Sequence, residues 1–194
     1  MRTHIDRPAF EAARAALSEH VGAVRARGVR AVAVTYPQVV DDLGDGDPDL
    51  QDALDIPVDG VPFDEVAFMV YQTAFAEAQG DWIGPGLVRS YALDARAHFG
   101  ERATMALGIV GTAAIFEHDG PPYASPSALG EDIGAALGAG VARVEVFSLD
   151  GMVELGDVAG WLAGTEAVPH TPALEPETRI VRAAARSLDE ALDP

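Results

Sequence analysis

Glu65-Val66-Ala67-Phe68-Met69-Val70-Tyr71 is a run of apolar and β-branched residues with the length of one buried strand. Three further stretches of the same character recur along the chain, at residues 31–36, 104–111 and 143–149. The segments between these stretches are each about 30 residues long, which is enough for a crossover helix and its loops. This rhythm predicts parallel βα units, whose functional groups gather at the carboxyl ends of the strands.

Helices are expected in the segments between the strands. One should begin near Pro8 and end at Gly28, a second should run from Gly84 to Gly100, and a third should follow Ser127. Two architectures fit this order: four strands of a (β/α)8-type barrel, forming half or part of it, or an open doubly wound sheet. Residues 1–194 fit a single α/β domain, or a fragment of a longer barrel because a helix opens the chain.

The composition excludes several classes of function. The chain has no Cys and no Lys, which removes disulfides, thiolate nucleophiles, Schiff-base lysines and the phosphate-binding Lys of a P-loop. A formal net charge of −18 repels nucleic acid and anionic membranes, so neither is an expected partner. The five histidines show no metal-binding spacing, and no metal or cofactor is predicted. No transmembrane run or export signal is apparent, so a soluble protein of unassigned location is expected.

Two local patterns have structural interpretations. Residues 41–55 contain seven Asp and are expected to form a solvated loop, since the closing Glu of a calcium-binding loop is missing. Gly130, Gly134 and Gly138 recur on one helix face, which predicts close packing of that helix on the sheet.

Two strand ends carry a resemblance to a known family. The strand that ends in Met69-Val70-Tyr71 resembles the sixth strand of chitinase-like glycoside hydrolase barrels, where a Met-x-Tyr segment lines the sugar cleft. Phe147-Ser148-Leu149-Asp150-Gly151-Met152 is similar to the end of their eighth strand. The resemblance covers most of residues 28–165 and implies the carboxyl-terminal half of a TIM barrel, with strands five to eight.

The chain also departs from that family. Nothing matches the Asp-x-x-Asp-x-Asp-x-Glu motif that supplies the general acid on the fourth strand, and Phe147 and Ser148 stand where a Trp is usual. The resemblance therefore implies that the acid would lie upstream of Met1 and that this chain alone would lack its catalyst.

Glycosidic hydrolysis needs two carboxyl groups, one to protonate the leaving oxygen and one to attack or to activate water. The acids that suit this role near strand ends are Glu117 and Asp150, although surface acids are common in an acidic protein. Side chains that could bind a sugar by hydrogen bonds or stacking are Tyr36, Gln38, Tyr71, Gln72 and Trp82.

Two functions remain open from the sequence. The first is a carbohydrate-active, glycoside-hydrolase-like barrel portion that binds a sugar at the carboxyl ends of its strands and is inactive as it stands. The second is a non-catalytic α/β interaction module, completed by a homodimer partner or by a missing barrel half, since a half barrel exposes apolar edges.

Overall fold

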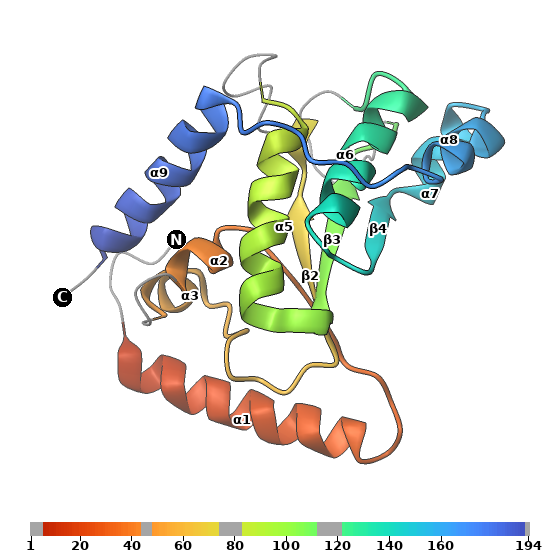
Figure 1. Cartoon of the computed structure of the whole chain (residues 1–194). Coiled ribbons are helices and arrows are strands. Elements are labelled where there is room, and N and C mark those ends of the chain that lie inside the picture. Colours follow the sequence, from red (N-terminus) through yellow and green to blue (C-terminus); the bar gives the residue numbers. More distant parts are fainter. Residues whose placement is uncertain (1–5, 44–47, 74–82, 112–121, 193–194) are drawn as a thin grey trace.

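The computed structural model describes residues 6–43, 48–73, 83–111 and 122–192 (Figure 1). The elements in chain order are α1 (Arg7–Arg25), β1 (Val32–Thr35), α2 (Val39–Asp42), α3 (Asp49–Leu54), β2 (Glu65–Val70), α5 (Pro85–Phe99), the 3₁₀ turn η1 (Gly100–Arg102), β3 (Ala103–Gly108), α6 (Pro126–Gly138), β4 (Val144–Phe147), α7 (Leu149–Glu154), α8 (Val158–Gly164) and α9 (Pro176–Glu190). Ser125, rather than Ser127, caps α6, because its hydroxyl accepts a hydrogen bond from the amide of Ala128.

The four strands form one parallel sheet in the order β1-β2-β3-β4. The register places Phe68 beside Met105 and Leu107 beside Val146. The prediction of parallel βα units is confirmed, and the sheet is open rather than closed into a barrel. A doubly wound sheet reverses its strand order at a switch point, and the four described strands show no such reversal.

The helices α5 and α6 lie in front of the sheet, and α9 lies on the other side of α5 from α6 (Figure 1). Under them, Phe68, Met105 and Leu107 are buried in one core with Leu87 of α5 and Leu129 of α6. Full burial of each such side chain contributes roughly 1.5–3 kcal/mol. Burial of apolar surface therefore fixes α5 and α6 to this face.

The opposite side of the sheet is called here the open face. Along β1 the side chains alternate, with Val32 and Val34 exposed at 42% and 57% while Ala33 and Thr35 are buried. Successive side chains of a strand point to opposite faces, so the exposed pair belongs to the open face. By the same alternation and register, the open face holds Val32, Val34, Ala67, Met69, Thr104, Ala106, Glu145 and Phe147. Its exposed residues lie on the edge strands, whereas Ala67, Thr104 and Ala106 at its centre are buried.

A polar layer closes the amino-terminal end of the open face. The Glu65 carboxylate is buried, accepts a hydrogen bond from the Thr104 hydroxyl and forms an ion pair with Arg30. Nε of Arg143 lies 3.5 Å from Oε2 of Glu65. One carboxylate thus ties together residues from β2 and β3 and from the segments that lead into β1 and β4.

The predicted solvated loop at residues 41–55 is wrong in its described part. Residues 39–42 and 49–54 form α2 and α3, and Asp41, Asp42, Asp49 and Asp52 are buried. Their carboxylates have polar partners: Asp42 accepts hydrogen bonds from the Leu50 amide at 2.6 Å and from the Gln51 side chain at 2.7 Å, and Asp49 pairs with Arg7 of α1. Buried acids are tolerated where such partners replace water.

The glycine face of α6 also differs from its prediction. It packs against the connector of residues 165–175 rather than against the sheet. A Cβ at Gly134 would lie 2.7 Å from the Val168 carbonyl oxygen, and a Cβ at Gly138 would overlap the carbonyl oxygen of His170. The His170 amide donates to the Gly134 carbonyl at 3.0 Å. The missing side chains therefore admit the connector, which carries the chain back across α6 and α5 to α9 (Figure 1).

Candidate binding surface at the carboxyl end of the sheet

An aromatic pair spans the carboxyl end of the sheet. The rings of Tyr71 and Phe147 stack with centroids 5.9 Å apart and planes 18° apart. Between them lies Gly108 of β3, where an added Cβ would be 3.0 Å from the Tyr71 ring and 3.2 Å from the Phe147 carbonyl oxygen. The absence of a side chain at Gly108 therefore lets the residues that end β2 and β4 meet across β3.

The other predicted sugar-binding residues differ in how accessible they are. Tyr36 follows β1 and is exposed at 51%, whereas Gln38 is half-buried at the start of α2. The side-chain amide of Gln72 donates to the Ile83 carbonyl, so this group holds the backbone of the neighbouring segment. Among the described residues of the predicted set, Tyr36 is the most exposed.

The predicted catalytic pair is not assembled by the described residues. Asp150 is exposed in the first turn of α7, whose N-cap is the hydroxyl of Ser148, 3.1 Å from the Gly151 amide. Glu117 and Trp82 lie outside the described residues. Of the residues near the strand ends, the structure brings Tyr71 and Phe147 into contact. The pairing of Glu117 with Asp150 stays a prediction.

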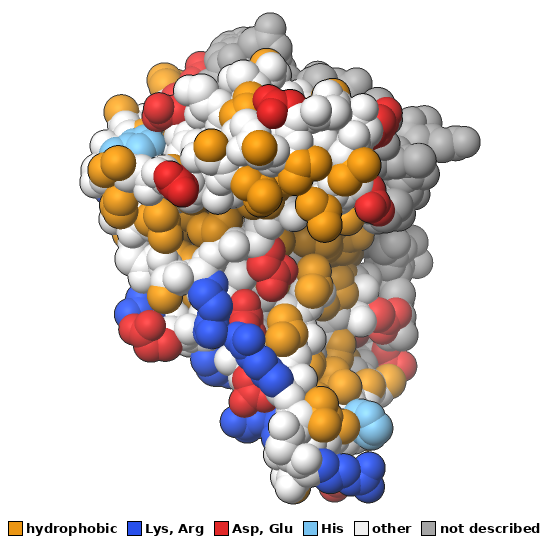
Figure 2. Space-filling view, turned by 90° about the vertical axis from the view of Figure 1, so that its right-hand side faces the viewer, with side chains coloured by type: hydrophobic (Ala, Val, Ile, Leu, Met, Phe, Trp, Pro, Cys, Tyr) orange, Lys and Arg blue, Asp and Glu red, His pale blue; other side chains and the backbone are white. Residues whose placement is uncertain are grey.

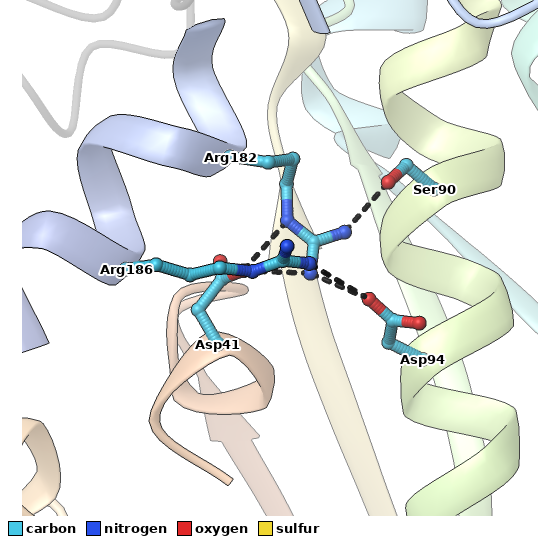
Figure 3. A network of polar contacts seen from close by, with 5 residues as sticks. All are labelled: Asp41, Ser90, Asp94, Arg182 and Arg186. Atoms are coloured by element: carbon cyan, nitrogen blue, oxygen red, sulfur yellow. Dashed lines mark hydrogen bonds and ion pairs between the residues drawn. The ribbon is translucent and has the colours of Figure 1, made fainter. Parts of the chain in front are cut away.

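A second cluster of polar side chains lies where α9 meets α2 and α5 (Figure 3). The Arg182 guanidinium donates to Oδ1 of Asp41 at 2.8 Å, to Oγ of Ser90 at 2.6 Å and to Oδ2 of Asp94 at 2.6 Å. It also lies 4.2 Å from the centroid of the Tyr91 ring, in cation–π geometry. Arg186 approaches the same two carboxylates from the solvent side, at 3.4 Å from Asp41 and 3.9 Å from Asp94.

Burial dominates the electrostatics of this cluster. Desolvation raises the pKa of Asp41, and the hydrogen bond and charge of Arg182 oppose that rise. Desolvation also lowers the pKa of Arg182, but its bonds to Asp41 and Asp94 outweigh this effect and the net pKa is raised. Burial likewise raises the pKa of Tyr91. Each charge is therefore stabilised mainly by its partner and hardly by water.

A cavity of about 560 Å³ adjoins this cluster. Its walls are formed by Val40, Asp41, Leu43, Asp94, Ala97, His98, Arg186, Asp189 and Glu190. Two of the acids in these walls, Asp41 and Asp94, contact arginines of α9. These contacts hold α9 against α2 and α5. Among the described residues, no group of three or more His, Asp or Glu side chains is placed to hold a metal ion.

One further buried acid lies on α6. Asp132 accepts a hydrogen bond from the Tyr123 hydroxyl at 2.5 Å, and both side chains are buried. Desolvation raises the pKa of Asp132 to about 7, the Tyr123 bond opposes the rise, and the charges of Glu175 and Glu131 add to it. Near neutral pH this carboxyl is therefore divided between its protonated and ionised forms.

Sequence reasoning missed the Tyr71–Phe147 stack and the Arg182 cluster. A signal for the second existed, because Arg182 and Arg186 are four residues apart on one helix face in a chain with an acidic run. Nothing in the sequence alone identified Gly108 as the contact point between Tyr71 and Phe147.

The comparisons with known proteins give no family for this chain. No protein-family model, no curated protein and no solved structure matches it. Within the described ranges, no helix has both the length and the apolar character needed to cross a membrane.

Proposed function

We propose that the chain binds a sugar at the carboxyl end of its sheet, as a glycoside-hydrolase-like barrel portion that works by binding rather than by hydrolysis. The observation that carries this proposal is the stack of Tyr71 on Phe147, at the edge where parallel βα units place their ligand sites. An aromatic face packs against the C–H face of a sugar ring, while hydroxyl and amide groups bind the sugar hydroxyls.

The residues that could add polar groups to such a site follow β1, the strand beside β2. Tyr36 is exposed there and Gln38 is half-buried. The net charge of −18 disfavours acidic sugars. The ligand class we propose is therefore a neutral or amino sugar rather than a uronate.

Binding is proposed without hydrolysis because hydrolysis needs two carboxyl groups with different protonation states beside one bond. Asp150 is exposed in the first turn of α7, and the carboxyl group predicted to act with it, Glu117, lies outside the described residues.

The test is a titration of the full chain with neutral and N-acetylated gluco-oligosaccharides, followed by calorimetry. Tyr71→Ala should weaken binding at least tenfold, which corresponds to about 1.4 kcal/mol, whereas Tyr71→Trp should retain it. Val168→Ala, which truncates an exposed apolar side chain on the connector, is the matched control and should bind normally. Absence of binding by the unmodified chain at millimolar sugar would overturn the proposal.

A second function is favoured by a different observation. Val32, Val34 and Tyr36 expose apolar surface along one edge of the sheet. Edge strands with exposed apolar side chains are sites where another chain adds on. A non-catalytic interaction module is therefore the alternative function.

A further inference from the structure

We infer that the partner of this edge is a second copy of the chain. Two copies would join with β1 of each beside β4 of the other, closing an eight-stranded (β/α)8-type barrel around the two open faces. This inference rests on the interaction-module function and is independent of sugar binding.

The topology makes the two edges of the sheet complementary. All four strands are parallel and follow chain order, so β1 and β4 are the two edges and point in the same direction. Both edge strands have four residues. A two-fold axis along the barrel brings β1 of each copy beside β4 of the other, parallel at both junctions. Eight strands form the barrel whose interior is just filled by side chains.

Exposed apolar side chains concentrate at the same two edges. Of twelve exposed large apolar residues in the described ranges, four lie at the β1 edge and four in the segment that follows β4. They are Val29, Val32, Val34 and Tyr36 on the first side, and Leu149, Val153, Leu155 and Leu162 on the second. Figure 2 views the molecule from the side of α7 and α8 and shows hydrophobic side chains in a band across it. Association of the two edges would bury both groups.

The amino-terminal ends of both edges carry an arginine. Arg30 leads into β1 and Arg143 leads into β4, and both contact the buried Glu65 carboxylate within one chain. The orientation of the two copies is therefore set by the strand directions and the exposed apolar side chains rather than by charge.

The first test is the mass of the full chain by light scattering over a concentration series. The expected result is twice the 20.3 kDa chain mass. Val34→Arg should weaken association at least tenfold, because Val34 is exposed on the open face at the β1 edge. Ile180→Arg makes the same change at an exposed site on α9 and should leave the dimer intact. Circular dichroism of both variants checks that they fold.

The second test identifies which edges meet. The chain has no Cys, so Val34→Cys and Glu145→Cys each carry one thiol, at β1 and at β4. A short bismaleimide should link the two variants when they are mixed faster than it links either variant to itself, because β1 and β4 are neighbours whereas the two β1 strands face each other across the barrel. Three results would overturn the inference: a monomer at every concentration, a mass that grows without limit as in an open filament, or linkage of Val34→Cys to itself that is faster than its linkage to Glu145→Cys. Failure of the sugar titration would leave these results unchanged.

Discussion

The helix layer of this protein contains two regions held by different forces. Between α5, α6 and the sheet, the buried side chains are mostly apolar, with Leu87, Leu129 and Ile133 among them, and Asp132 is a buried acid on α6. Where α9 meets α2 and α5, the buried side chains of α9 include Thr178, Arg182 and Asp189. One region therefore depends on hydrophobic burial and the other on partnered charges.

The difference follows from what each helix covers. α5 and α6 pack over the centre of the sheet, where β2 and β3 present apolar side chains. α9 lies beside α2 and α3, which are built from an acidic sequence. A helix that docks on buried carboxylates must supply matching bases, and Arg182 does so for Asp41. Stability of this region should therefore depend strongly on single charged residues.

The largest effect is expected for Arg182→Ala. This change leaves Asp41, whose side chain is fully buried, without its main partner and removes the bonds to Ser90 and Asp94. Removal of one member of a buried ion pair costs about 3–5 kcal/mol. Urea unfolding should show this loss, whereas Arg179→Ala, at an exposed position of the same helix, should cost under about 0.5 kcal/mol. A loss below about 1 kcal/mol for Arg182→Ala would contradict the comparison.

Asp132 is a buried titratable group on α6, and its ionisation should make the stability of this region depend on pH. The folded protein raises its pKa from the ordinary 3.8 to about 7. Its contribution to stability is therefore complete below pH 4 and is lost as the pH rises through 7, by up to about 4 kcal/mol at 1.36 kcal/mol per pKa unit.

Asp132→Asn should remove this pH dependence, because the amide oxygen still accepts the Tyr123 hydrogen bond but cannot ionise. Relative to the unmodified chain, the variant should gain stability from pH 5 to about pH 7 in urea unfolding, and the difference should level off above pH 7. Tyr123→Phe is the control that removes the hydrogen bond and keeps the carboxyl. A difference in stability between Asp132→Asn and the unmodified chain that stays constant from pH 5 to pH 7 would show that the pKa of Asp132 is not raised in the folded state.

A substitution at the contact of α6 with the connector should have an intermediate effect on stability. Gly138→Ala should improve helix propensity by about 1 kcal/mol, yet its Cβ would overlap the His170 carbonyl oxygen. Overpacking of this kind costs about 1–3 kcal/mol, so a net loss of stability is expected. Gly22→Ala in α1 meets no atom within 4 Å and should instead stabilise the protein by about 0.5–1 kcal/mol. Thermal melts of the two variants should therefore shift in opposite directions.

The strands were predictable because each lies in a stretch rich in apolar and β-branched residues. Residues 65–71 and 143–149 contain β2 and β4, and the helix expected from Gly84 to Gly100 is α5. In the candidate site, Tyr71 was predicted from its position at a strand end, and the structure places it directly after β2. Its contact with Phe147 depends on the space above Gly108, which is a property of three neighbouring strands.

Other features depend on contacts that no local pattern contains. The burial of Asp41 requires Arg182, which lies 141 positions further along the chain. The glycines of α6 indicated close packing, and the segment that fills the space comes from residues 165–175. An acidic run can be solvated or buried, and a row of glycines can pack against a sheet or against another segment. The residues that contact them in the folded chain decide which occurs.

The smallest effect is expected for Arg186→Ala, and it sharpens the comparison most directly. Arg186 contacts the same two carboxylates as Arg182, but its side chain is 57% exposed whereas that of Arg182 is 5% exposed. Exposed ion pairs contribute about 0–1 kcal/mol and are screened by salt, so urea unfolding should show a loss in that range which shrinks further in 1 M NaCl. Losses of equal size for Arg182→Ala and Arg186→Ala would mean that the number of charges, and not their burial, holds α9 in place.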